Sequence, residues 1–102
     1  MIIDLKNQDI NLLFAQHDKV IVDIYATWCG PCKMLSTQLQ EFAKNHKDWT
    51  IIKVDSDQNQ ALASEYNVQA VPTMLIVVKG KKMETIVGFK PLVELERITD
   101  KY

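Results

Sequence analysis

Cys29 and Cys32 are the residues of this chain best suited to chemistry, and no other cysteine occurs among its 102 residues. In a helix, residues three positions apart lie on one face, with Cβ atoms roughly 5–6 Å apart. A disulfide needs Cβ atoms about 3.5–4.5 Å apart, so a small local adjustment would let this pair close and open. The spacing therefore predicts a reversible dithiol/disulfide centre.

The residues around the pair indicate how one sulfur is activated. Pro31 suits the first turn of a helix, where the amide N–H that proline lacks would have no partner. Cys29 would then lie at the helix start, beside unpaired N–H groups and the positive end of the helix dipole. That setting favours the thiolate and lowers the pKa of a cysteine from its free value of about 8.5.

Runs of apolar residues predict the elements that position this centre. Residues 19–26 are almost continuously apolar, which indicates a strand buried on both faces. A helix is expected at residues 31–47, with an inner stripe of Met34, Leu35, Leu39, Phe42 and Ala43. Further strands are expected at residues 1–5, 49–55, 73–78 and 82–87. Three further helices are expected: one from a cap at Asn7 or Asp9 to residue 16, one at 58–66 with Ala61 and Leu62 inward, and one at 91–100. This order predicts one central sheet with helices on both faces.

The composition limits the classes of function. Apolar residues make up 47% and charged residues 25%, as in an ordinary globular protein, and the length suits one domain spanning residues 1–102. Twelve basic and thirteen acidic residues leave a formal charge of −1, which does not indicate binding to nucleic acid or to an anionic membrane. No apolar run approaches the roughly 18 residues of a membrane span, and the first residues lack the pattern of a signal peptide. We therefore expect a cytoplasmic protein, where a C-x-x-C pair indicates redox chemistry or metal binding.

Three stretches of the chain resemble the signature of the thioredoxin family. Residues 22–33 read V-D-I-Y-A-T-W-C-G-P-C-K, which is similar to the family's sequence from the end of one strand into the next helix. V-P-T at residues 71–73 resembles the family's second landmark, and V-G at residues 87–88 resembles its third. A C-x-x-C pair alone is a weak signal, but this combination in this order of elements is highly specific and covers the whole chain.

The resemblance implies an α/β thioredoxin fold, in which a central mixed five-stranded sheet is flanked by helices on both faces. It implies a protein-disulfide reductase in which Cys29 attacks the disulfide of a client protein and Cys32 resolves the mixed disulfide. No bound cofactor is expected, because the two sulfurs carry the reducing equivalents. A thioredoxin reductase would recharge them from NADPH, with the flavin on that partner, and the protein itself is expected to be a monomer.

Asp23 is unusual because it places a carboxylate in the buried strand, six residues before Cys29. Burial makes a carboxylate costly to ionise and raises its pKa. In the family the matching aspartate accepts and donates the proton of the resolving thiol, so we expect Asp23 to act as general acid and base for Cys32. The alternative, which does not exclude this role, is a structural charge paired with Lys53, whose family counterpart lies nearby.

Clients are expected to dock around the cysteines. On frequency alone the peptide bond before Pro72 would be trans, but the resemblance implies a cis bond that faces the disulfide. The Val71 backbone would then be free to pair with an extended client segment. The expected substrate-binding residues, a flat apolar rim, are Trp28, Gly30, Pro31, Ala70, Val71, Pro72, Gly88 and Phe89. Trp28 could instead be an ordinary core tryptophan.

Three positions depart from the family's pattern. Tyr25 stands where many members have tryptophan. Thr37 stands where many have a proline that kinks the long helix, so this helix is expected to be straighter. Phe89 follows Gly88 where a small residue is common, and we expect this aromatic ring to restrict which client proteins bind.

Three alternatives to a general reductase remain open from the sequence. The cysteines could merely pack or bind zinc, but a closed zinc site takes four ligands, and His17 and His46 have no ligand spacing with them. The protein could serve one dedicated client, such as a peroxide-scavenging or ribonucleotide-reducing enzyme. It could also be a non-enzymatic binding module that uses the rim as a subunit interface.

Overall fold

The computed structural model describes residues 1–102, and its elements follow the predicted order. The elements are β1 (Ile2–Asp4), α1 (Ile10–Gln16), β2 (Lys19–Tyr25), α2 (Gly30–Asn45), β3 (Thr50–Asp55), α3 (Gln60–Glu65), β4 (Thr73–Val78), β5 (Lys81–Val87) and α4 (Leu92–Thr99). Every predicted helix and strand is present, and no end differs from its predicted position by more than two residues. Asp9 is the N-cap of α1, where its Oδ1 accepts a hydrogen bond from the Asn11 N–H at 2.9 Å.

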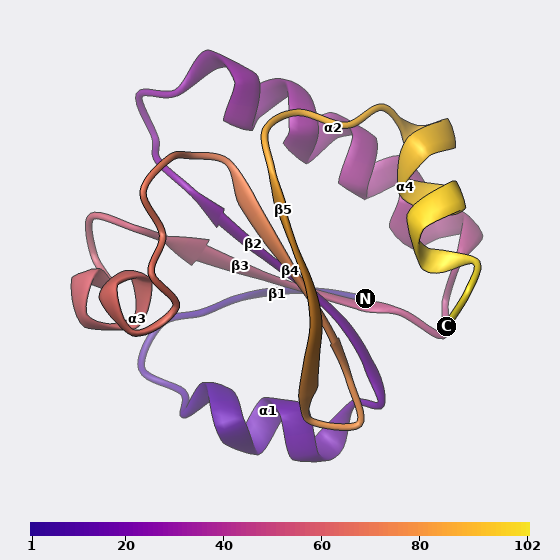
Figure 1. Cartoon of the computed structure of the whole chain (residues 1–102), viewed down its shortest axis with the longest axis horizontal. Helices are drawn as coiled ribbons and strands as arrows, with labels where there is room; N and C mark the ends of the chain where they lie inside the picture. Colours follow the sequence, from indigo (N-terminus) through magenta and orange to yellow (C-terminus); the bar gives the residue numbers. More distant parts are fainter.

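The five strands form one mixed sheet in the order β1-β3-β2-β4-β5. Strand β3 pairs in parallel with β1 and β2, whereas β4 pairs antiparallel with β2 and β5. Helices α1 and α3 lie on one side of this sheet, and α2 and α4 lie on the other (Figure 1). The expected mixed five-stranded sheet with helices on both faces is therefore confirmed, and β2 is its central strand.

Strand β2 is buried on both faces, as its apolar run predicted. Side chains alternate along a strand, and Val20, Val22 and Ile24 accordingly join the core under α1 and α3. Ile21 belongs instead to the core under α2 and α4. The same alternation places Asp23 on the side of Ile21, toward α2.

The inner face of α2 differs from its prediction at one position. Leu35 and Leu39 are buried, whereas Met34 is 58% exposed. Successive side chains of a helix point about 100° apart, so with Leu35 aimed at the sheet its neighbour Met34 turns away. The prediction for Met34 was wrong. The prediction for Ala61 was also wrong, because this residue is exposed while Leu62 packs against the core.

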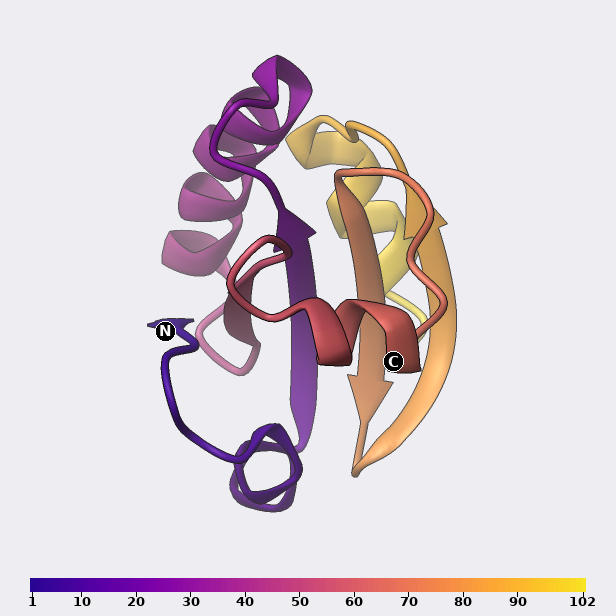
Figure 2. The ribbon, with the colours of Figure 1, turned by 90° about the vertical axis from the view of Figure 1, so that its left-hand side faces the viewer.

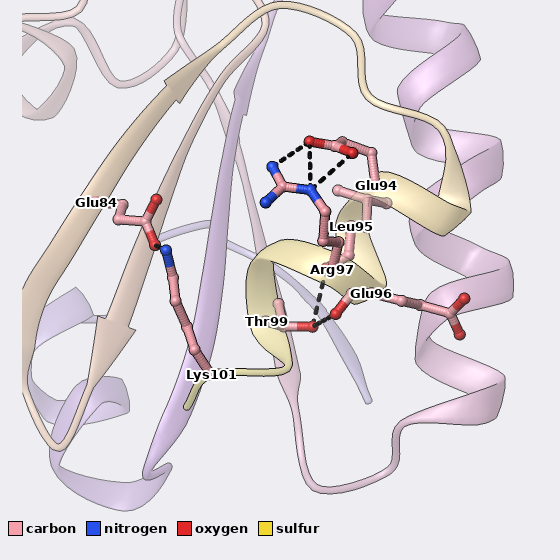
Figure 3. A network of polar contacts seen from close by, with 7 residues as sticks. All are labelled: Glu84, Glu94, Leu95, Glu96, Arg97, Thr99 and Lys101. Atoms are coloured by element: carbon pink, nitrogen blue, oxygen red, sulfur yellow. Dashed lines mark hydrogen bonds and ion pairs between the residues drawn. The ribbon is translucent and has the colours of Figure 1, made fainter.

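Helix α4 is fastened to both α2 and the edge strand β5. At its start, the Leu92 N–H donates a hydrogen bond to Gln38 Oε1 of α2 at 2.7 Å. Beyond its end, Lys101 forms an ion pair with Glu84 of β5 at 2.9 Å (Figure 3). The buried Thr99 hydroxyl donates to the backbone carbonyl four residues earlier at 2.9 Å. These contacts hold α4 beside α2 and complete the helical layer that covers Asp23's side of the sheet.

Two neighbouring positions on α2 test this packing. Leu35→Ala should lower the free energy of unfolding by about 2–5 kcal/mol, because it leaves a cavity at a fully buried site. Met34→Ala should change it by less than about 0.5 kcal/mol, because that side chain is mostly in water. Urea unfolding followed by tryptophan fluorescence measures both values. A similar loss in the two variants would contradict the assignment of the buried face.

Candidate active site

The loop between β2 and α2 (Figure 2) ends at Cys29, and Cys32 lies in the first turn of α2. The Cys29 N–H donates to the Ala26 carbonyl at 3.3 Å, which turns the chain directly after the strand. Cys29 is the N-cap of α2, and its Sγ accepts a hydrogen bond from the Cys32 N–H at 3.2 Å. The two residues form a disulfide, with their Cα atoms 5.3 Å apart. The predicted disulfide at the start of a helix is confirmed.

The two sulfurs differ in their access to solvent. Cys29 is 6% exposed and Cys32 is 3% exposed, so Cys29 is the more accessible of two largely buried residues. Gly30 and Pro31 between them are exposed, and Pro31 lies in the first turn of α2 as expected. The N–H groups and the dipole of this helix terminus stabilise negative charge on the Cys29 sulfur when the disulfide is reduced.

A second loop, directly before β4, faces the disulfide. The peptide bond between Val71 and Pro72 is cis, as the resemblance implied. The Val71 carbonyl oxygen lies 3.8 Å from Cys29 Sγ. The Gly88 N–H, just after β5, donates to the Pro72 carbonyl at 2.8 Å and holds this loop in place. Three separate parts of the chain therefore meet beside one disulfide.

The predicted rim is partly exposed and partly covered. Trp28 is 71% exposed, and its indole N–H donates to Asp57 Oδ2 at 3.1 Å, so the alternative of a core tryptophan was wrong. Ala70 is exposed, and Gly88 is half-buried. Phe89 is also half-buried and packs against the core under α2 and α4, so only part of this side chain reaches the surface. Sequence reasoning missed Asp57, since no local pattern links it to a residue 29 positions earlier.

Asp23 lies in the interior of the sheet, level with Lys53 of β3 and Met74 of β4. Its side chain is fully buried, and neither carboxylate oxygen has a hydrogen-bond partner. Burial raises the pKa of Asp23 from its ordinary 3.8 to about 6, although the charge of Lys53 acts to lower it. Lys53 Nζ lies 3.9 Å from Asp23 Oδ2. The expected pairing is present as an ion pair, at a distance too long for a hydrogen bond.

A cavity of about 250 Å³ lies beside Cys32 and is lined in part by Tyr25, Ser36 and Lys53. Lys53 donates a hydrogen bond to Ser36 Oγ at 2.6 Å, and its ammonium group lies 4.9 Å from the centre of the Tyr25 ring. Sequence reasoning missed Ser36. Its position four residues after Cys32, which places both on one face of the helix, was the signal that could have found it.

Other ionisable side chains of the protein are not arranged as a metal centre. No set of three or more His, Cys, Asp or Glu side chains could hold a metal ion. His17 Nδ1 lies 3.2 Å from Thr50 Oγ1, and His46 Nε2 lies 2.8 Å from Glu96 Oε2. No helix is both long enough and apolar enough to cross a bilayer.

Comparison with known proteins identifies the family. The family model described as Thioredoxin matches residues 2–101. The chain belongs to the thioredoxin family. It is similar to a thioredoxin of Mycoplasmoides gallisepticum, with 41% identity over 90 residues, which are 88% of this chain and 90% of that protein. It is also similar to a thioredoxin of Bacillus subtilis, with 42% identity over 84 residues, which are 81% of each chain.

The fold and the activity of the protein follow from these findings. A mutant thioredoxin from Halobacterium salinarum has a similar structure, with a TM-score of 0.92 and 34% identity over 99% of this chain and 89% of that one. The predicted thioredoxin fold is therefore confirmed. With its redox-active cysteine pair, the protein is a protein-disulfide reductase that acts by dithiol/disulfide exchange. The thioredoxin family acts on client proteins that contain disulfides and needs no bound cofactor.

The buried carboxyl of Asp23, which has no hydrogen bond, predicts how stability depends on pH. Because its pKa is raised in the folded protein, folding is favoured while it is protonated, and stability falls as pH rises from about 4 through about 6. Asp23→Asn cannot ionise, so it should be more stable than the parent by about 2–3 kcal/mol at pH 7.5. The gain should shrink to less than about 1 kcal/mol at pH 4 and vanish at still lower pH, as the carboxyl of the unfolded parent also becomes protonated.

Urea unfolding at both pH values measures this difference. Asp18→Asn is the matched control, because Asp18 is exposed and should show no such dependence on pH. An equal gain of Asp23→Asn at pH 4 and pH 7.5 would mean that ionisation of Asp23 is not its cause.

Proposed function

We propose that Cys29 is the attacking thiol of this exchange and that Cys32 is the resolving thiol. The observation that carries the proposal is the position of Cys29 Sγ, at the N-terminus of α2 and beside the Val71 carbonyl. The Cys29 thiolate attacks one sulfur of a client disulfide, and the other client sulfur leaves as a thiolate. The Cys32 thiolate then attacks Cys29 Sγ, and the second client sulfur leaves. Two electrons pass to the client, and the protein is left with the Cys29–Cys32 disulfide.

Asp23 is proposed to take the proton of Cys32 before the second attack and to return it when the disulfide is reduced. A carboxyl with a pKa of about 6 can both hold and release a proton close to neutral pH, which supports this role. Lys53 contributes by lowering the pKa of Asp23, which limits how tightly the proton is held.

Client binding is assigned to the surface around Cys29. An extended client segment would pair with the backbone of Val71, a mode that reads the main chain and tolerates many side chains. The other residues of the rim would supply apolar contacts, and they are Trp28, Gly30, Pro31, Ala70, Gly88 and Phe89, whereas Pro72 of the predicted rim is buried. The exposed part of Phe89 would contact the client close to the disulfide, where a large ring can select between partners.

The electron donor, the monomeric state and the cellular compartment of the protein belong to the same proposal. A thioredoxin reductase would return the two electrons from NADPH through a flavin held by that partner, which makes the protein a carrier in electron transport. Residues 1–102 would act as a single domain and a monomer in the cytoplasm, where thiols are kept reduced. The formal charge of −1 supports clients that are proteins rather than nucleic acids.

Replacing each cysteine by serine, one at a time, tests the two roles. Cys29→Ser should abolish the reduction of insulin and should form no mixed disulfide, because the attacking sulfur is gone. Cys32→Ser should attack normally but accumulate the mixed disulfide, because no second thiol can release the client. Non-reducing electrophoresis and mass spectrometry detect the adduct. A mixed disulfide formed through Cys32 in the Cys29→Ser variant would reverse the assignment.

The same Cys32→Ser variant distinguishes a general reductase from a dedicated one. Added in its reduced form to a cell extract that contains no reductant and so keeps its client disulfides, it should trap many client proteins, as expected from recognition through the backbone of Val71. Cys29→Ser carried through the same procedure is the control for capture without exchange. A single trapped protein would contradict the general reductase and favour a dedicated one.

Removing the exposed indole tests the docking surface. Trp28→Ala should raise the KM for insulin several-fold, because the ring is mostly exposed and would pack on the client rather than on the core. The rate with oxidised glutathione should hardly change, since so small a disulfide needs little of the rim. Leu12→Ala removes an equally exposed apolar side chain from α1, on the other side of the sheet, and is the control. An unchanged KM for insulin would contradict the role of Trp28.

A further inference from the structure

The ammonium group of Lys53 has neighbours on two elements, α2 and β2, and it hydrogen-bonds to a hydroxyl rather than to a nearby carboxylate. Lys53 Nζ lies 2.6 Å from Ser36 Oγ on α2 and 3.9 Å from Asp23 Oδ2 on β2. Hydrogen bonds of this type extend to about 3.2 Å, so only the contact with Ser36 is one. The cation therefore donates to a neutral hydroxyl, while the carboxylate nearby receives no hydrogen bond at all.

We propose that Ser36 is a positioning residue whose hydroxyl accepts a hydrogen bond from Lys53 and thereby keeps the ammonium group out of hydrogen-bonding distance of Asp23. A carboxylate is a stronger acceptor than a hydroxyl, so the observed arrangement needs a reason. The reason is that the two acceptors are held on different elements. Ser36 lies on α2, which covers the sheet, whereas Asp23 lies on β2 within the sheet. Lys53, with a side chain only 17% exposed, spans the space between them.

Removal of the Ser36 hydroxyl would leave Asp23 as the remaining acceptor among these neighbours. The Lys53 ammonium group has limited access to water, so the lost hydrogen bond must be replaced largely within the protein. A shift of about 1 Å would bring Nζ to the distance typical of a charged hydrogen bond to Oδ2. Lys53 also lies over the face of the Tyr25 ring, with its Nζ 4.9 Å from the ring centre.

Such a hydrogen bond from Lys53 would lower the pKa of Asp23. That this matters for the reaction rests on the proposed function of Asp23. A direct hydrogen bond from a cation favours the charged carboxylate and lowers its pKa further than a charge at a distance does. Ser36 would thus keep Asp23 protonatable close to neutral pH, where the resolving step needs it.

The other groups around Asp23 leave Lys53 as the controlling charge. Strand β4 places Met74, which cannot titrate, level with Asp23. Helix α2 contributes Cys32 and Lys33 to the cavity, and Lys33 is exposed to solvent, which screens its charge. On β2 itself, Tyr25 has its pKa raised by burial first, and then by the charges of Asp55, Asp4 and Asp23. Among all of these groups, Lys53 is the one whose charge shifts the pKa of Asp23.

Direct titration of Asp23 in the oxidised protein tests the proposal without any enzymatic assay. In Ser36→Ala, carbon-detected NMR of labelled aspartate should show the pKa of Asp23 lower by about one pH unit. Thr37→Ala is the matched control, because the Thr37 hydroxyl donates to the Lys33 carbonyl of its own helix at 3.4 Å and should leave Asp23 unchanged. Ser36→Thr keeps a hydroxyl and should restore the parent value. An unchanged or higher pKa in Ser36→Ala would overturn the proposal.

A second background shows whether the effect runs through Lys53. In a Lys53→Gln protein, Ser36→Ala should cause no further change in the pKa of Asp23, since there is no ammonium group to reposition. A change of the same size in that background would also overturn the proposal.

Kinetics separate this proposal from the role assigned to Asp23. If Asp23 takes the proton of Cys32, the pH dependence of the resolving step should move to lower pH in Ser36→Ala by the same amount as the titration. If the titration moves and the kinetics do not, Ser36 positions Lys53 as proposed, and it is the catalytic role of Asp23 that fails.

Discussion

The pairing of β2 with a strand on each side is the interaction on which the rest of the structure depends. β2 runs parallel to β3 and antiparallel to β4, so its backbone groups are satisfied within the sheet while helices cover both faces. The strand ends at Tyr25, and the chain reaches the N-cap of α2 only four residues later. The reactive disulfide is therefore held between two well-packed elements, which is where a site can be positioned accurately.

The order of the strands also explains why three distant segments meet at the disulfide. β2, β4 and β5 are neighbours in the sheet, and their directions alternate. The end of β2, the start of β4 and the end of β5 therefore lie at the same edge. Cys29 follows the first, Pro72 precedes the second and Gly88 follows the third, so the proposed docking surface arises from topology rather than from any one loop.

The central strand carries a costly group as well. Ionisation of Asp23 in this interior opposes folding by about 3 kcal/mol, a substantial part of the 5–15 kcal/mol that stabilises a typical domain. That cost remains even though the charge of Lys53 lowers the pKa of Asp23, and the hydrogen bond of Lys53 goes to Ser36 instead. A protein selected for stability alone would not keep a carboxyl without hydrogen bonds there, and its position on the α2 side, toward the helix that begins at the disulfide, is consistent with the proposed role in proton transfer.

The sequence by itself determined the order of the elements, the burial of β2 and the disulfide at a helix start, because these depend on residues close together in the chain. Apolar runs report burial, and C-x-x-C with Pro31 reports the local turn. The cis bond before Pro72 came only with the family resemblance, since its frequency alone argues for trans. Met34 was misplaced because a stripe of apolar residues is wider than the face a helix buries. Only the tertiary structure decided that Phe89 packs partly into the core and that Lys53 turns to Ser36, because such contacts depend on how far side chains reach between elements.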